Sequence, residues 1–229
     1  MQSEKEKLYA HVDFYRDLLD IPFNQPIKLV DILAPMMQFD VEYSPFKTPG
    51  LCGVAMVGEK TDTIILNSNR TSEEQNFDCG HEFLHLTEHR KLRDSFNCFT
   101  KAKPQQNTFR EWQANEGSAQ LLVPYQDFIP RVSVYFNAYC PDALIDLPNI
   151  LAEHYFVSPQ VISIRLDSLS YEIEQYRNGR SIGEIELLSR TQRKNLKKKF
   201  TNYSALCAFS IDWDAAIKSF EQMPERIHI

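Results

Sequence analysis

The feature that most constrains the fold of this chain is the motif His-Glu-Phe-Leu-His at residues 81–85. Residues four apart lie on one face of an α-helix, so a single helical turn brings the imidazoles of His81 and His85 together. Such a pair can bind one Zn²⁺ ion, whereas burying two imidazoles without partners would be costly. We therefore expect a helix here that turns its histidine face toward the interior.

Two overlapping capping boxes mark the start of this helix. Glu74 follows Thr71 by three residues, and Gln75 follows Ser72 by three residues. The helical spacing then places five side chains in one partly apolar stripe: Phe77, His81, Leu84, His85 and Glu88. The alternative, a surface helix that carries two histidines by chance, is less favoured because this stripe indicates a buried face.

Catalytic zinc usually has three protein ligands and one open position for water. Glu82 follows His81, where its carboxylate could take a proton from the activated water. Glu111 is the best candidate for the third ligand, because it is the polar end of a helix face that is otherwise small or apolar. Its rival Glu116 lies about 140° round that helix. Asn115 shares the face of Glu111 and could support a ligand or simply pack between helices.

Three segments together resemble the ImmA/IrrE family of metallopeptidases, whose pattern is HELGH, then ExxAN, then a run close to AAELLMP. The segments are FDCGHEFLHL at 77–86, EWQAN at 111–115 and LLVP at 121–124, with a further likeness at 151–166. The resemblance covers roughly residues 27–170. It implies that His81, His85 and Glu111 are zinc ligands and that Glu82 is the catalytic acid/base.

The sequence departs from this pattern on both helices. Leu84 stands where Gly is usual, Gly80 where Ala is usual, and Gly117-Ser118 where bulkier residues are common. None of these departures removes a candidate ligand, but a larger Leu84 could alter how closely a neighbouring strand approaches.

The composition indicates a protein with a sizeable core and no general affinity for nucleic acid. Hydrophobic residues make up 43% of 229 residues, and the net charge is −6. The N-terminal residues lack the apolar run of a signal peptide, and no stretch is long enough to span a membrane. We expect a cytoplasmic protein, and five cysteines without CxxC spacing fit a reducing compartment.

The periodicity along the chain predicts an α+β fold. Helices are expected at 4–19 and 26–37, and strands at 38–43, 53–57 and 63–66. The strands are expected to form a small antiparallel sheet packed on the HExxH helix and the second ligand helix. Residues 91–109 are polar, with a loop at 101–107 near the site. The remainder is predicted to be mainly helical, with a metallopeptidase domain at 1–178 and a helical C-terminal extension at 179–229.

A sheet edge beside such a site could bind an extended peptide by strand addition. We expect residues 53–57 to form this edge, although a buried strand that binds nothing is an equally good interpretation. A donor that steadies the oxyanion is also needed, and the spacing does not choose between His89, Tyr125 and His154. Cys98 lies between the ligand helices and is a minor alternative ligand.

Two further segments bear on partners. Residues 151–169 resemble a helix-turn-helix, but the second helix carries only Arg165 as a cation before Asp167, so packing is favoured over DNA binding. Five cations are spaced to share one helical face: Arg190, Arg193, Lys194, Lys197 and Lys198. That face could hold an acidic partner, although a solvated surface is the simpler interpretation.

These features favour an intracellular, gluzincin-like zinc endopeptidase of narrow specificity, with Glu82 as general base. The resemblance implies a regulatory protein as substrate, such as a helix-turn-helix repressor, often linked to mobile elements or stress responses. Two alternatives stay open. One is a toxin–antitoxin or phage-associated component that acts through a partner, and the other is a DNA-binding regulator whose metal site is structural.

Overall fold

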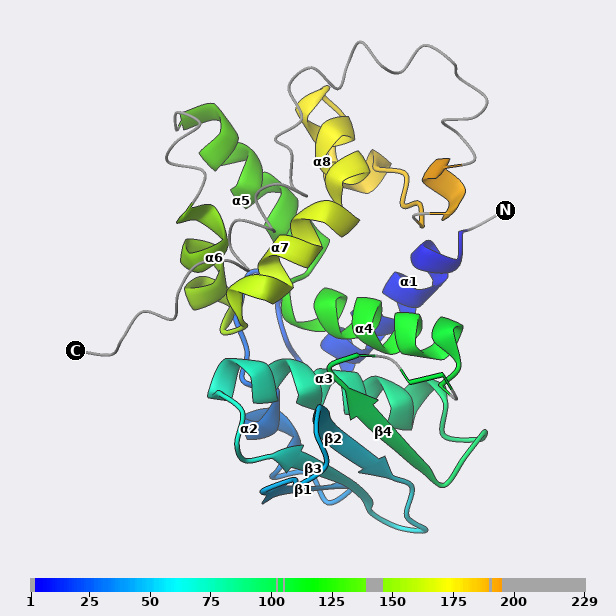
Figure 1. Ribbon diagram of the computed structural model, residues 1–229. Helices are drawn as coiled ribbons and strands as arrows, with labels where there is room; N and C mark the ends of the chain where they lie inside the picture. The colour runs from blue at the N-terminus through cyan, green and yellow to red at the C-terminus, as the bar shows by residue number, and fades with distance from the viewer. Residues whose placement is uncertain (1–2, 102, 105, 139–145, 190, 195–229) are drawn as a thin grey trace, which may run out of the picture.

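The structure is a computed structural model that describes residues 3–101, 103–104, 106–138, 146–189 and 191–194 (Figure 1). Its strands are β1 (Phe39–Ser44), β2 (Leu51–Met56), β3 (Asp62–Asn67) and β4 (Ser95–Phe99). Its α-helices are α1 (Glu4–Leu18), α2 (Leu29–Leu33), α3 (Ser72–Glu88), α4 (Thr108–Leu122), α5 (Tyr125–Ala138), α6 (Leu147–Tyr155), α7 (Pro159–Ser168) and α8 (Ser170–Arg177). The predicted α+β fold with a mainly helical C-terminal part is confirmed.

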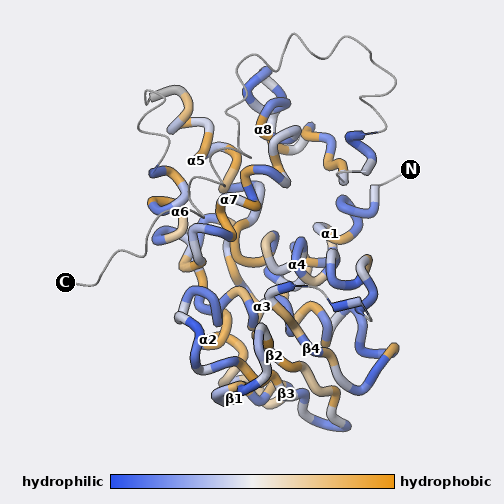
Figure 2. Tube along the Cα trace, viewed as in Figure 1, coloured by the Kyte–Doolittle hydropathy of each residue, from blue (hydrophilic) through white to orange (hydrophobic). Residues whose placement is uncertain are grey.

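The molecule is layered around α3, which packs across the sheet and carries α4 on its other side (Figure 1). Hydrophobic residues gather on the inner strands and hydrophilic residues on the outer turns (Figure 2). Since α3 is covered from both sides, every residue from Asp78 to Leu86 is buried. The helix is therefore enclosed over two turns, more fully than the single apolar stripe in its sequence predicts.

The sheet has the strand order β1-β3-β2-β4. β2 runs antiparallel to both of its neighbours, but β1 pairs in parallel with β3, from Phe39 opposite Asp62 to Ser44 opposite Asn67. The expectation of a purely antiparallel sheet is wrong for β1, because this strand pairs with β3 rather than with β2, the next strand in sequence.

β4 was not expected, since it lies in the polar stretch assigned to a loop. It pairs antiparallel with β2, and it alternates buried Phe96 and Cys98 with exposed Ser95 and Asn97. β2 is therefore an interior strand, and the expectation that residues 53–57 form the sheet edge is wrong. Among the described residues the edges are β1 and β4, and β4 is the edge that packs beside α3.

The unusual residues of the two ligand helices fit one another. A Cβ atom at Gly117 of α4 would lie 2.9 Å from Cδ1 and Cγ of Leu84, so the small residue makes room for the large one. In the same way a Cβ atom at Gly80 would overlap the Ser118 side chain. Leu84 therefore packs on α4, and its size is accommodated between the helices rather than at a strand.

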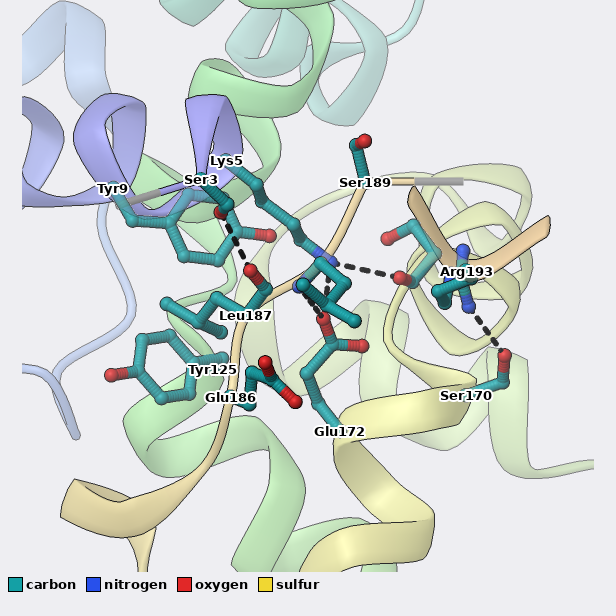
Figure 3. Close-up of polar contacts among 12 residues, drawn as sticks. Ser3, Lys5, Tyr9, Tyr125, Ser170, Glu172, Glu186, Leu187, Ser189 and Arg193 are labelled. Carbon is teal, nitrogen blue, oxygen red and sulfur yellow. Dashed lines mark hydrogen bonds and ion pairs between the residues drawn. The ribbon is translucent and has the colours of Figure 1, made fainter. Parts of the chain in front are cut away.

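Buried polar contacts tie the end of the described chain to α1 (Figure 3). Lys5 Nζ donates to Glu172 Oε1 on α8 at 2.9 Å, and the backbone N–H of Leu188 donates to the same oxygen at 3.1 Å. Ser3 Oγ donates to the carbonyl of Leu187 at 2.6 Å. Residues 185–188 are thus packed against the N-terminal helix, although they follow the expected boundary at residue 178.

Most of the expected C-terminal extension lies outside the described residues, including Arg190, Lys197 and Lys198 of the basic face. Arg193 is described, and it turns toward α8, where it donates to Ser170 Oγ at 2.9 Å. The division at residue 178 stays a prediction. In the part of the chain that the structure describes, no helix has the length and apolarity needed to cross a membrane.

Candidate metal centre

The local sequence of α3 explains why its histidines are held so firmly. Thr71 is the N-cap, and its hydroxyl accepts from the backbone N–H of Glu74 at 3.3 Å. The Glu74 carboxylate accepts from the Thr71 N–H at 3.1 Å, which completes the first of the two expected capping boxes. His81 lies in the second half of the helix and His85 in its last turn, and each is only 1% exposed. Their positions are fixed by a capped helix that is buried on both sides.

Three side chains from α3 and α4 converge on one point. The Nε2 atoms of His81 and His85 are 3.1 Å apart, and Glu111 oxygens lie 3.5 Å and 3.7 Å from them. Tetrahedral zinc bound at about 2.1 Å separates its ligand atoms by roughly 3.4 Å. Burial lowers the pKa of His85 to about 2, helped by the nearby His81 and His89, so this ring is kept in the neutral form that binds metals. The donor set and its spacing fit a zinc ion.

The Nδ1 atoms of His81 and His85 both have hydrogen-bond partners, which leaves the Nε2 atoms available to a metal ion. His81 Nδ1 lies 3.0 Å from Asn115 Oδ1, and because an amide oxygen only accepts, the ring donates. His85 Nδ1 lies 2.9 Å from His89 Nδ1, and His89 Nε2 lies 3.2 Å from Gln113 Oε1. Gln113 fixes His89 as a donor through Nε2, so His89 Nδ1 accepts from His85. Asn115 thus holds the His81 ring by a hydrogen bond, which is the first of its two expected roles, the support of a candidate ligand.

Glu82 is completely buried, and neither carboxylate oxygen makes a hydrogen bond of normal geometry among the described residues, although the backbone N–H of Cys98 lies close enough to oppose part of the rise in the Glu82 pKa. Burial raises the pKa of Glu82 well above its usual value, and the nearby carboxylates of Asp78 and Glu111 raise it further. An unpaired buried carboxyl is costly, so it is expected where chemistry requires it. This side chain is held where it can exchange a proton with a reactant at the three converging side chains.

Gly53 of β2 makes the position of Glu82 possible, and sequence reasoning did not identify it. A Cβ atom at Gly53 would lie 2.8 Å from Glu82 Oε1 and 3.0 Å from its Cγ. The strand can approach the carboxylate this closely only because no side chain intervenes. A glycine within a β-rich segment was the available signal.

Residues 27–167 match the M78 peptidase family, described as the IrrE N-terminal-like domain. The chain belongs to this family. No curated protein matches the sequence. The M78 match runs from the start of α2 almost to the end of α7, so it contains the whole sheet and both helices of the site. The resemblance to ImmA/IrrE metallopeptidases is confirmed, and a protease-like, metal-dependent role follows at the level of the family.

Within the M78 domain, Glu116 points away from the site and into a buried cluster. Its Oε1 accepts from Tyr9 at 2.5 Å and from Arg165 at 3.0 Å, and Lys5 lies 4.0 Å away. Burial alone would raise the pKa of Glu116, but Lys5 and Arg165 outweigh it and hold that pKa below its usual value. Of the two glutamates on α4, only Glu111 reaches the histidines.

The cationic residue of the helix-turn-helix segment is also part of this cluster. Arg165 is 0% exposed and donates to the carbonyl of Val123 at 3.1 Å and to Gln120 at 2.6 Å. It cannot meet a phosphate from that position, so the packing interpretation holds for Arg165.

None of the three oxyanion candidates reaches the site. His89 is buried behind His85, Tyr125 stacks on Tyr9 with ring centroids 5.7 Å apart, and His154 packs against Tyr155. Cys98 does come close, because its Sγ lies within 4.8 Å of ligand atoms of His81 and Glu82. It approaches from β4, where the sequence suggested a loop.

A cleft of about 170 Å³ opens beside the three converging side chains. His85 and Glu111 form part of its wall, and the rest comes from β4, the start of α4 and the segments before and after β4. Three cations line it: Arg93, Lys103 and Arg110. Sequence reasoning did not single out these cations, because they come from segments that are not adjacent along the chain.

Proposed function

We propose that this M78 protein is a zinc-dependent endopeptidase. Its zinc ligands are His81, His85 and Glu111, and Glu82 is its general acid/base. The observation that carries the proposal is the convergence of three ligand atoms beside a completely buried, unpaired carboxyl group. The open cleft at this point supports a catalytic rather than a purely structural role, because a structural zinc site is closed by four protein ligands.

The residues of the site divide the chemistry between them. When bound, zinc supplies a Lewis acid that polarises a peptide carbonyl and lowers the pKa of water. Glu82 then takes a proton from the attacking water and passes it to the leaving amine. Asn115 and His89 hold the two imidazoles in the tautomer that presents Nε2, which removes the need to reorient them at each turnover.

The edge of β4 is the surface that best supports binding of an extended substrate by strand addition. The Asn97 carbonyl points away from β2, where it accepts a hydrogen bond from Gln106 Nε2 at 2.9 Å. This side-chain amide sits where the backbone of an added strand would donate. A bound peptide would therefore displace Gln106 and take over its hydrogen bond.

As substrate we propose a regulatory protein in the cytoplasm, such as a helix-turn-helix repressor, cut at one site. Narrow specificity agrees with the small volume of the cleft, about 170 Å³. The alternative of a DNA-binding regulator is less favoured, because Arg165 is buried in internal contacts.

Glu82→Gln tests the proposal. The amide is nearly isosteric but cannot accept the proton, so the variant should keep its zinc and lose activity by about 10²–10⁴-fold. Metal analysis and cleavage of candidate repressors would be compared with the wild-type chain, with casein as a generic substrate that should stay intact. Undiminished cleavage by Glu82→Gln, or rapid digestion of casein by the wild type, would contradict the proposal.

A further inference from the structure

The cleft beside the ligands carries a local charge opposite to that of the whole chain. The chain has a net charge of −6, yet the cleft is lined by Arg93, Lys103 and Arg110. Among the described residues of its wall the only carboxylate is that of Glu111, which is turned to the histidines as a candidate ligand. Like charges held in one concave surface create a positive potential that attracts an anion.

None of these three cations is neutralised by a neighbouring carboxylate. In the described ranges every ion pair within 4.0 Å involves other residues. Lys103 instead lies over the Phe99 ring, with Nζ 4.9 Å from its centroid. A cation–π contact holds the ammonium in place without neutralising it. The cations therefore remain able to pair with a ligand.

The three cations surround the path of a substrate that adds to β4. Arg93 precedes the strand, Lys103 contacts Phe99 at its end, and Arg110 faces the cleft from α4 next to Glu111. A strand of five residues spans about 13 Å. Any peptide that follows β4 past the ligands thus runs between cations at both of its ends and beside a third.

We propose that this cleft selects peptides with acidic side chains, and that Arg93, Lys103 and Arg110 determine this specificity. The inference rests on the proposed peptidase function and adds its substrate class: a segment with at least one Asp or Glu within about three residues of the scissile bond. Guanidinium groups pair with carboxylates through two parallel hydrogen bonds. The two arginines therefore constrain the orientation of a bound carboxylate as well as attracting its charge.

Peptide binding to the zinc-loaded, full-length Glu82→Gln protein tests this without requiring cleavage. The probes are a fluorescein-labelled ten-residue peptide with two central glutamates and the same peptide with two glutamines. Fluorescence anisotropy should give at least tenfold tighter binding of the acidic peptide, because hydrogen bonds between charged groups are the stronger ones. The difference should shrink as salt is added.

Charge variants made in the Glu82→Gln background assign the preference to the cleft. Arg93→Gln, Lys103→Gln and Arg110→Gln together should abolish it. The matched control, Lys7→Gln, Lys60→Gln and Lys194→Gln, changes three exposed cations that do not line the cleft and should preserve it. Since zinc is present in all of these proteins, attraction by the metal cancels in the comparison.

Three results would overturn this inference: equal affinity for the two peptides, no measurable binding of the acidic one, or a preference that survives the triple cleft variant. The proposed peptidase function is judged separately, by zinc content and by cleavage. A protein that cuts its substrate without preferring acidic peptides would retain the function and lose only the specificity.

Discussion

Two glutamates five residues apart on α4 have opposite surroundings. Glu111 faces the imidazoles of His81 and His85 across 3.5–3.7 Å, whereas Glu116 is surrounded by a tyrosine and two cations. No cation among the described residues pairs with the Glu111 carboxylate, so that site can accept a metal ion. The charge of Glu116 is already balanced by Lys5 and Arg165. The same residue type is thus set up for metal binding at one position and for structural stability at the other.

The matched substitutions Glu111→Gln and Glu116→Gln separate these roles. Glu111→Gln should weaken zinc binding by more than about a hundredfold, since even residues behind the ligands contribute about 10–100-fold. Glu116→Gln should keep the zinc but lower the free energy of unfolding by about 1.5–3 kcal/mol, because hydrogen bonds to charged groups are lost. Metal analysis and urea unfolding measure the two effects. The reverse pattern of zinc loss would show that the third ligand is Glu116.

Gly53→Ala should move the Glu82 carboxylate without unfolding the protein. The added methyl group would meet the flexible end of the Glu82 side chain at 2.8 Å, so the side chain rather than the strand is expected to yield. Misplacement by about 1 Å can cost up to a hundredfold in rate, so kcat should fall by roughly 10–100-fold with zinc content unchanged. Gly183→Ala is the control, since nothing lies within 4 Å of its added Cβ. Full activity in Gly53→Ala would show that the close approach does not position Glu82.

At the scale of elements, the contact between α3 and α4 determines whether the three candidate ligands meet. Leu84 lies on the face of α3 that Gly117 of α4 approaches most closely, one residue before His85. The large side chain on one helix and the missing one on the other set the spacing between the helices. That spacing in turn brings Glu111 to the two histidines.

A double-mutant cycle on Leu84 and Gly117 tests this fit. Gly117→Ala overpacks the interface and should cost about 1–3 kcal/mol of stability, while Leu84→Ala leaves a cavity and should cost about 2–5 kcal/mol. The double variant should lose less than the sum, because the new methyl group occupies part of the space that Leu84 leaves. Thermal and urea unfolding give the three values. Strict additivity would mean that the two residues do not share one space.

At the scale of the whole molecule, the described segment after α8 packs on the same folded unit that holds the candidate metal centre. Ile185, Leu187 and Leu188 are buried, and Ser3 and Lys5 of the N-terminal region bind the segment directly or through Glu172. Residues near the N-terminus and residues after α8, which are far apart in sequence, therefore pack against each other. A domain that ended at residue 178 would expose this surface.

Comparing chains 1–180 and 1–194 measures what this segment contributes. The shorter chain lacks three buried apolar side chains, each worth about 1.5–3 kcal/mol. It should be less stable than the longer chain by several kcal/mol, as read from urea unfolding. Equal stabilities would instead support the boundary at residue 178.

Comparing KM for the full chain and for 1–194 then tests whether residues 195–229 help to dock the substrate.

The sequence by itself determined the parts of this protein that depend on neighbours within a few turns of helix. The capped helix, the paired histidines, Glu82 beside them and the face of Glu111 follow from a spacing of 3.6 residues per turn, which the backbone fixes wherever a helix forms. The polar and apolar alternation of β4 was also readable, although its polar surroundings concealed it.

Only the tertiary structure decided the strand order, the parallel pairing of β1 and the interior place of β2. A strand's own pattern says which face is buried but not which distant strand lies beside it, because pairing depends on contacts summed over the whole fold. The approach of Gly53 to Glu82 and the meeting of Arg93, Lys103 and Arg110 have the same cause. Each brings together residues from separate elements, whose distances become fixed only when α3 is packed between the sheet and α4.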